Sequence, residues 1–236
     1  MKTKYDNVYV NPEAGEIDPS IIAFDLDSVM NDGCSGAIRK KFCDHWDIND
    51  REILDKDVVL GHRIFSMSPP AYCEASGNEI FNLVTEAVIE ESPSFLHTPY
   101  MPEVMRYVYE VTGTPIQVCT ARRPECVDVT HNWLAEHLGD IPFRAYVQNG
   151  VAKSVTLDRM NCQIFVDDRF KTVNNLLSWI SEPVLYRRPW NQNRPVKLPV
   201  LEVRDLRDII PVINIALGRV PMDWPSYVPF PKPRGE

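Results

Sequence analysis

The order of apolar and polar positions separates a helical stretch of the chain from a stretch in which strands and helices alternate. Residues 21–24 are a continuous apolar run of the kind that forms a buried strand. Few strand signals follow in 32–98, where apolar side chains recur at helical spacing within 36–46 and 78–91. The two prolines within 66–72 interrupt this pattern. We therefore expect one strand followed by a mainly helical insert.

Beyond residue 101 the pattern changes to alternating strands and helices. A helix is expected at 102–113, with Pro at its start and Gly at its end. The further elements are strand 115–120, helix 126–139, strand 143–148, a loop running into a weak helix at 151–160, strand 162–168, helix 170–180, strand 183–188, and a strand and last helix within 198–217. Strands separated by helices imply right-handed crossovers, so the sequence predicts an α/β fold with a mostly parallel sheet flanked by helices.

Both ends of the chain fall outside this pattern. The segment 1–20 has a basic start but no apolar region like that of a secretory signal, and we expect an extension without a catalytic role. The segment 219–236 holds too many prolines for a helix or a central strand, so we expect an extended arm on the surface. Packing of this arm on a partner subunit through Trp224, Tyr227 and Phe230 stays open, and with it a homodimer.

The composition is that of a soluble globular protein. The 236 residues are enough to bury a core, and the apolar fraction of 44% and the charged fraction of 25% are ordinary. No apolar run approaches the roughly 18 residues that a membrane span needs, so we expect a cytoplasmic protein without a membrane partner. The net charge of −8 disfavours nucleic acid as a partner, because counterion release needs clustered Lys and Arg. Small anionic substrates remain open.

The six cysteines are scattered and show no CxxC spacing, so we expect them to be reduced. A zinc site from Cys34, Cys43, His45 and Cys73 is the alternative, but its spacing matches no ordinary zinc pattern.

Residues with chemical potential follow three of the expected strands. They are Asp25 and Asp27 after the first strand, Thr120 at the end of the second, and Asp167 and Asp168 at the end of 162–168, with Lys153 on the connection between the last two strands. In open parallel α/β sheets, ligands bind outside the carboxyl ends of the strands. Positions i and i+2 of a strand point to the same side, so the first two aspartates are expected to converge.

A cluster of carboxylates at one edge of the sheet requires a cation to be stable. Hard oxygen ligands with room for water favour Mg²⁺. A carboxylate-bound metal together with a Lys ammonium and a Thr hydroxyl forms a site for a phosphate group, whose negative oxygens bind both the metal and the ammonium. The sequence therefore predicts a small phosphorylated substrate.

The order D-x-D-x-V, a strand ending in Thr, a Lys and a strand ending in Asp-Asp resembles the haloacid dehalogenase (HAD) superfamily of phosphatases, over about residues 20–210. The resemblance implies a Rossmann-like core formed by 21–31 and 99–218, and a helical cap at 32–98 inserted after the first strand. It also implies an Mg²⁺-dependent phosphoric monoester hydrolase that works through an aspartyl-phosphate.

The resemblance assigns a role to each matching residue. Asp25 matches the nucleophile, and Asp27 matches the acid that protonates the leaving alcohol and then activates water. Thr120 and Lys153 match the residues that hold the phosphoryl oxygens and balance charge. Many members have Gly after the second Asp where this chain has Ser28. Ser can take the turn with little strain if its φ stays negative, so we expect activity to survive.

The metal ligands implied by the resemblance are Asp25, the main-chain carbonyl of Asp27 and one acid of the Asp-Asp pair. We favour Asp168 as the direct ligand, with Asp167 as its supporting neighbour facing Lys153. Either acid of the pair remains open as the ligand.

Two segments narrow the expected substrate. Residues 91–105 and 185–192 are similar to segments of the 5′(3′)-deoxyribonucleotidases, which implies a (deoxy)nucleoside monophosphate and a role in nucleotide metabolism. Phe95 and Trp190 are then candidates for contact with the substrate near the base or the cap hinge. Packing between cap and core is an equally good interpretation of Phe95.

Arg122 and Arg123 are candidates for binding phosphate or for salt bridges, and we favour Arg122 as the substrate-binding residue. One alternative function is a polynucleotide 3′-phosphatase of end repair, because viral enzymes of that kind carry a stretch similar to Asp167–Arg169. The other is a non-catalytic protein that binds a phosphorylated ligand with the same fold.

Overall fold

The structure, a computed structural model, describes residues 17–47, 77–148, 152–193, 195–197 and 200–219. Most of the leader 1–20, the arm from residue 220 onward with its three aromatic residues, and Cys73 lie outside the described residues.

The described strands form one sheet in which every neighbouring pair is parallel, as the sequence predicts. The order is β3-β2-β1-β4-β5-β6. The bounds are Ile22–Phe24 (β1), Ile116–Thr120 (β2), Phe143–Val147 (β3), Ile164–Asp167 (β4), Glu182–Tyr186 (β5) and Leu201–Val203 (β6). β1 lies between β2 and β4, with Phe24 paired to both Val118 and Val166. The strand order therefore reverses at β1, the point at which ligands bind in sheets of this kind.

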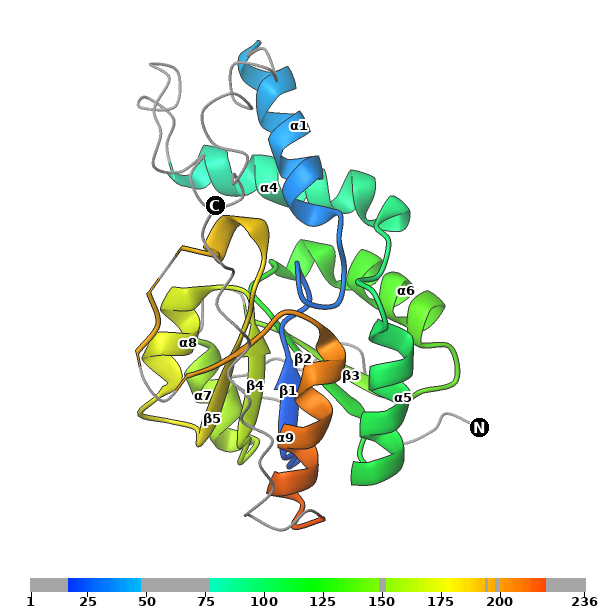
Figure 1. The fold of residues 1–236 in the computed structure, drawn as a ribbon. Coiled ribbons are helices and arrows are strands. Elements are labelled where there is room, and N and C mark those ends of the chain that lie inside the picture. Colours follow the sequence, from blue (N-terminus) through cyan, green and yellow to red (C-terminus); the bar gives the residue numbers. More distant parts are fainter. Residues whose placement is uncertain (1–16, 48–76, 149–151, 194, 198–199, 220–236) are drawn as a thin grey trace, which may run out of the picture.

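Helices cover both faces of the sheet (Figure 1). Side chains of α5 (Met101–Thr112), α6 (Val127–Leu138) and α9 (Ile209–Ala216) pack with Ile22 and Phe24 of β1 on one face. α7 (Lys153–Arg159) and α8 (Phe170–Leu176) pack with Ala23 on the other. This alternation follows from the two-residue period of a strand. Because β1 is buried on both faces, each of its positions favours an apolar side chain, which explains the continuous apolar run at 21–24.

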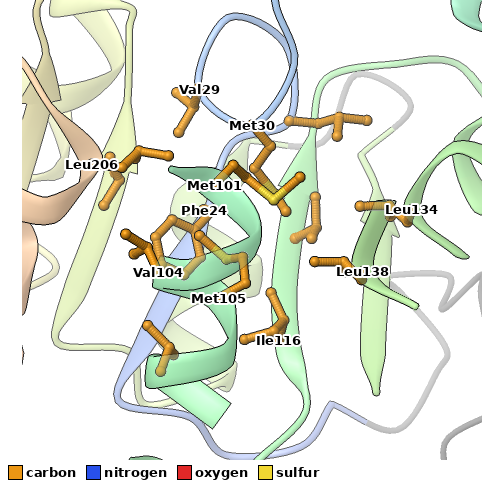
Figure 2. Close-up of a cluster of buried hydrophobic side chains, with 14 of the residues drawn as sticks. Phe24, Val29, Met30, Met101, Val104, Met105, Ile116, Leu134, Leu138 and Leu206 are labelled. Atoms are coloured by element: carbon orange, nitrogen blue, oxygen red, sulfur yellow. The ribbon is translucent and has the colours of Figure 1, made fainter. Parts of the chain in front are cut away.

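The larger core lies between the sheet and α5. Figure 2 shows Phe24 against Met101 and Met105, with Ile116 and Leu134 beside them. Four of these five are fully buried aliphatic or sulfur-containing side chains, and burial of each stabilises the fold by about 1.5–3 kcal/mol. The rigid core ends where β1 ends, and the candidate residues begin there.

A helical pair lies beyond the carboxyl ends of the strands (Figure 1). α1 (Cys34–Trp46) and α4 (Gly77–Glu91) pack through the buried side chains of Phe42 and Leu83. Lys41 on α1 forms ion pairs with Glu86 and Glu90 on α4. The pair occupies the insert that the sequence predicts to be a cap, and the exact division into core and cap stays a prediction.

Two segments that connect the sheet to this pair run side by side. Thr98 donates its backbone N–H to the carbonyl of Met30 at 2.8 Å, and Asp32 donates to Leu96 at 2.8 Å. Asn31 and His97 form an antiparallel bridge between these bonds. Short 3-10 turns complete the structure at Ser92–Ser94 (η1), Pro124–Cys126 (η2), Pro189–Asn191 (η3) and Leu206–Asp208 (η4).

Several elements end earlier than the sequence predicts. The helix expected at 170–180 ends at Leu176, because the chain then turns so that Ile180 packs in the core cluster beside Phe165. β5 ends at Tyr186, and the N–H of Arg188 instead donates to the side chain of Asn191 at 2.9 Å. Among the described residues, no helix combines the length and apolar character needed to cross a membrane.

Candidate active site

The two aspartates after β1 lie on a tight turn. The N–H of Asp25 still bonds to Val166 of β4 at 2.8 Å, so its backbone belongs to the sheet. The turn then closes when Met30 and Asn31 both donate to the carbonyl of Leu26, at 2.9 and 3.1 Å. A strand end followed by a closed turn holds both aspartates at fixed positions.

Ser28 in this turn does not meet the condition for a turn with little strain. Its φ is 67°, in the left-handed region, whereas that condition was a negative φ. Ser28 lies within the turn that the hydrogen bonds of Met30 and Asn31 to Leu26 close. For a residue with a side chain this conformation costs roughly 1–2 kcal/mol, which the buried turn must offset.

Lys153 forms ion pairs with acids at the ends of β1 and β4. It is the first residue of α7, and its Nζ lies 2.9 Å from Asp25 Oδ2 and 2.7 Å from Asp167 Oδ2. Burial lowers the pKa of Lys153, but the charges of Asp167 and Asp25 outweigh it, so the pKa lies above its usual value. The structure thus gives a buried, charged ammonium at the site, and it places Asp167 against Lys153 as the sequence predicts.

Three buried carboxylates lie together at this edge. Asp25, Asp167 and Asp168 each offer an oxygen within 4.8 Å of the others. Burial raises the pKa of Asp25 to about 8; Lys153 lowers it, and the neighbouring carboxylates, Asp167 first, raise it. Three carboxylates and one ammonium leave an excess of negative charge in a buried place. This donor set fits a divalent cation such as Mg²⁺, which prefers oxygen ligands.

Arg122 holds the carboxylate of Asp27 from the loop after β2. Its Nε and Nη2 donate to the two oxygens at 3.0 and 2.6 Å, and its Nη1 donates to Thr130 at 3.0 Å. Asn31 adds a bond to Asp27 Oδ1 at 2.9 Å. Burial raises the pKa of Asp27, but the charge and hydrogen bonds of Arg122 outweigh it, so the pKa lies below its usual value. Arg122 therefore lies at the site, in contact with the expected acid/base residue.

Thr120 is the last residue of β2 and is fully buried. Its Oγ1 accepts the N–H of Arg122 at 3.3 Å, and its carbonyl accepts the N–H of Gln148 at 3.0 Å. Because β2 pairs with β1, Thr120 belongs to the same edge of the sheet as the aspartates.

The remaining predicted residues have no contact with the acids among the described residues. Phe95 is buried in the larger core, and a Cβ placed on Gly33 would lie 2.2 Å from its ring. This close contact is the packing that the sequence left open, and contact with substrate stays a prediction. Trp190 lies in η3, and its side chain is outside the described part of the chain. Arg123 contacts α4, with its Nη1 2.8 Å from Asn82 and its guanidinium over Phe81.

Of the four residues of the zinc alternative, Cys73 lies outside the described residues. His45 pairs with Glu79 at 3.2 Å, and Cys34 and Cys43 are buried and form no disulfide among the described residues.

Two asparagines at the site were missed by the sequence analysis. Asn31 contacts Asp27, as described above. Asn191 donates from its Nδ2 to the carbonyls of Asp168 and Tyr186, at 2.6 and 2.9 Å, and so ties the end of β4 to the end of β5. Asn191 could have been found from its place in the segment 185–192, which the sequence analysis singled out. For Asn31 the sequence offers only a polar residue directly after two apolar ones.

Comparisons with known proteins bear on the fold. Neither a scan against family models nor a search of curated sequences gave a match. Solved structures do match: CbbY from Rhodobacter sphaeroides in complex with phosphate has a TM-score of 0.55 at 11% identity, over 82% of this chain and 96% of that one.

Two further structures match with slightly lower TM-scores. A predicted phosphoglycolate phosphatase from Haemophilus somnus has a TM-score of 0.52 at 14% identity, over 84% of this chain and 100% of that one. A HAD family hydrolase from Deinococcus radiodurans, with bound phosphate and sodium, has a TM-score of 0.51 at 10% identity, over 85% and 97%. The chain therefore has the fold of HAD hydrolases, as its sequence predicts.

Proposed function

We propose that the protein is an Mg²⁺-dependent phosphomonoesterase in which Asp25 forms an aspartyl-phosphate. The proposal rests mainly on one arrangement, the buried Lys153 ammonium between Asp25 and Asp167 with Asp168 beside them. A fixed carboxylate next to a buried ammonium and a cation site is suited to attack on a phosphorus atom whose oxygens carry negative charge.

In the first step, an oxygen of Asp25 forms a bond to phosphorus while the bond from phosphorus to the alcohol oxygen breaks. Asp25 is positioned for this by the N–H of Leu26, which donates to Oδ1 at 2.8 Å, and by Lys153 on Oδ2. Asp27 donates its proton to the departing alcohol. In the second step Asp27 takes a proton from the water that attacks phosphorus. The bond from phosphorus to the Asp25 oxygen breaks, and inorganic phosphate leaves.

Arg122 favours the ionised form of Asp27, which is the form that accepts a proton from water. A phosphate group beside Asp27 raises the pKa of this carboxyl, because a nearby negative charge disfavours ionisation. The same side chain can therefore act as an acid with substrate bound and as a base after the alcohol has left. Lys153 and the Thr120 hydroxyl hold the phosphoryl oxygens.

The residues that would hold Mg²⁺ are Asp25, Asp168 and the main-chain carbonyl of Asp27, with Asp167 supporting them. A bound cation supplies charge neutralisation at the phosphoryl oxygens. Asp167 is suited to the supporting role because its oxygens bind Lys153 at 2.7 Å and the N–H of Arg169 at 2.7 Å.

A (deoxy)nucleoside monophosphate is the substrate that we propose within this class. The helical pair α1–α4 lies beyond the strand ends, and α4 contacts the loop after β2 through Arg123, Phe81 and Asn82. A cover of this kind favours small phosphorylated molecules over polymers. The net charge of −8 also disfavours a nucleic-acid substrate.

The experiment is a measurement of phosphate release from ribo- and deoxyribonucleoside monophosphates, p-nitrophenyl phosphate and a 3′-phosphorylated oligonucleotide, with Mg²⁺ and with EDTA. We expect release from nucleotides that requires Mg²⁺ and is lost in Asp25→Asn. Release only from the oligonucleotide would favour end repair. No release from any substrate would contradict the phosphatase and favour a binding protein.

A further inference from the structure

Asn31 is a polar residue in an apolar place. It follows Val29 and Met30, and all three side chains are fully buried. Its Nδ2 donates to Asp27 Oδ1 at 2.9 Å, while its Oδ1 is buried without a hydrogen-bond partner among the described residues. The reversed orientation of the amide would set two oxygens against each other, so the N–H faces Asp27.

An unpartnered buried oxygen is unfavourable for folding. A leucine at this position would remove the oxygen together with its cost. The part of Asn31 that an apolar residue cannot replace is therefore the N–H directed at Asp27.

The backbone of Asn31 is fixed from both sides. Its N–H bonds to Leu26 in the turn after β1, and it forms bridges with Asp27 and with His97 of the returning segment. The amide group thus has a defined position before any substrate binds, which is the property that makes a hydrogen bond useful in catalysis.

Two donors from different elements converge on one oxygen of Asp27. Oδ1 accepts from Arg122 Nη2 at 2.6 Å and from Asn31 Nδ2 at 2.9 Å, whereas Arg122 Nε lies 3.0 Å from Oδ2. Arg122 binds both oxygens from the loop after β2, and Asn31 adds a second donor to Oδ1 from the turn after β1.

We propose that Asn31 is a positioning residue for the acid/base function of Asp27. Its N–H anchors Oδ1, so that Oδ2 gives the proton to the leaving alcohol and later takes one from water. This inference rests on the proposed phosphatase activity and deepens it.

The test compares leaving groups in Asn31→Ala and Asn31→Leu. The ratio kcat/KM reports the steps up to release of the alcohol. Nitrophenolate leaves p-nitrophenyl phosphate without a proton, whereas the sugar oxygen of a nucleoside monophosphate needs one. Since positioned acids contribute about 10²–10⁴-fold, we expect a loss of about tenfold or more with the nucleotide. With p-nitrophenyl phosphate we expect a loss below about threefold.

A matched control separates positioning from folding. Asn174 on α8 accepts the backbone N–H of Lys197 on its Oδ1 at 2.8 Å, far along the chain from Asn31. Asn174→Ala should leave kcat/KM unchanged for both substrates. Asn31→Leu should melt at a temperature no lower than that of Asn31→Ala, because both remove the unpartnered oxygen and only Leu fills the space.

Equal losses on both substrates, or no loss on either with an active wild type, would overturn the role of Asn31 alone. A wild type that releases phosphate from neither substrate would overturn the proposed function, and the inference with it.

Discussion

Lys153 illustrates how much of the site depends on single residues. Its buried ammonium lies 2.9 Å from Asp25 and 2.7 Å from Asp167. Removing one member of a buried ion pair leaves the other charge uncompensated.

We therefore expect Lys153→Met to lower the free energy of unfolding by about 3–5 kcal/mol in EDTA. Mg²⁺ should restore part of this loss, because a bound cation compensates the same carboxylates. Urea unfolding with EDTA and with Mg²⁺ measures both values. Lys171→Met, an exposed site on α8, is the control. A loss of the same size with and without Mg²⁺ would contradict the cation site.

At the scale of single residues, the sequence predicted which side chains meet but not how they bind one another. Asp25, Asp167 and Lys153 meet because parallel strands bring their ends to one edge, which a pattern can predict. The left-handed Ser28 and the Asn31 contact depend on the path of a turn that only the tertiary structure defines. Neither the conformation nor the contact has a counterpart in the periodicity of the sequence.

Among the elements, α1 begins where the chain passes from the sheet to the helical pair. Gly33 stands just before the helix, and a side chain there would overlap the ring of Phe95. Gly36, one turn later, has open space around the position of a Cβ.

The same substitution should therefore have opposite effects at these two glycines. Gly33→Ala should destabilise the protein by about 1–3 kcal/mol, because Phe95 must move out of the core. Gly36→Ala should stabilise it by up to about 1 kcal/mol, since Ala favours a helix. Thermal unfolding of both variants checks the prediction, and a stable Gly33→Ala would show that α1 is not packed on Phe95.

The bounds of the elements were predicted well where burial of apolar side chains determines them, and poorly where local contacts do. β1, β2 and α5 were expected from apolar runs and caps, and the structure has them within two residues. The ends of α8 and β5 were misplaced, because a turn toward the core and the Asn191 side chain end them. Element ends of this kind have no strong signal in sequence.

In the whole molecule, the sheet order brings three loops to one edge and places the helical pair beyond it (Figure 1). This arrangement, predicted from alternating strands and helices, positions the acids before any ligand binds. The substrate and the oligomeric state do not follow from the arrangement alone, since neither changes the pattern of burial in a single chain.

A cation that binds the folded protein must raise its melting temperature. We expect millimolar Mg²⁺ to stabilise the wild type and to have no such effect on Asp168→Asn, which lacks one of the three carboxylates. Asp158→Asn, an exposed acid on α7, should respond like the wild type. An undiminished response of Asp168→Asn would place the cation elsewhere.

The central claim is that Asp25 carries the phosphoryl group. It is tested most directly in Asp27→Asn, where p-nitrophenyl phosphate can still react but the base that activates water is missing, so the phosphoenzyme should accumulate. After an acid quench and proteolysis, mass spectrometry should find one phosphoryl group on the peptide that contains Asp25, and none in the Asp25→Asn, Asp27→Asn double variant. A wild type that releases phosphate, together with an unmodified Asp25 peptide in Asp27→Asn, would contradict the account.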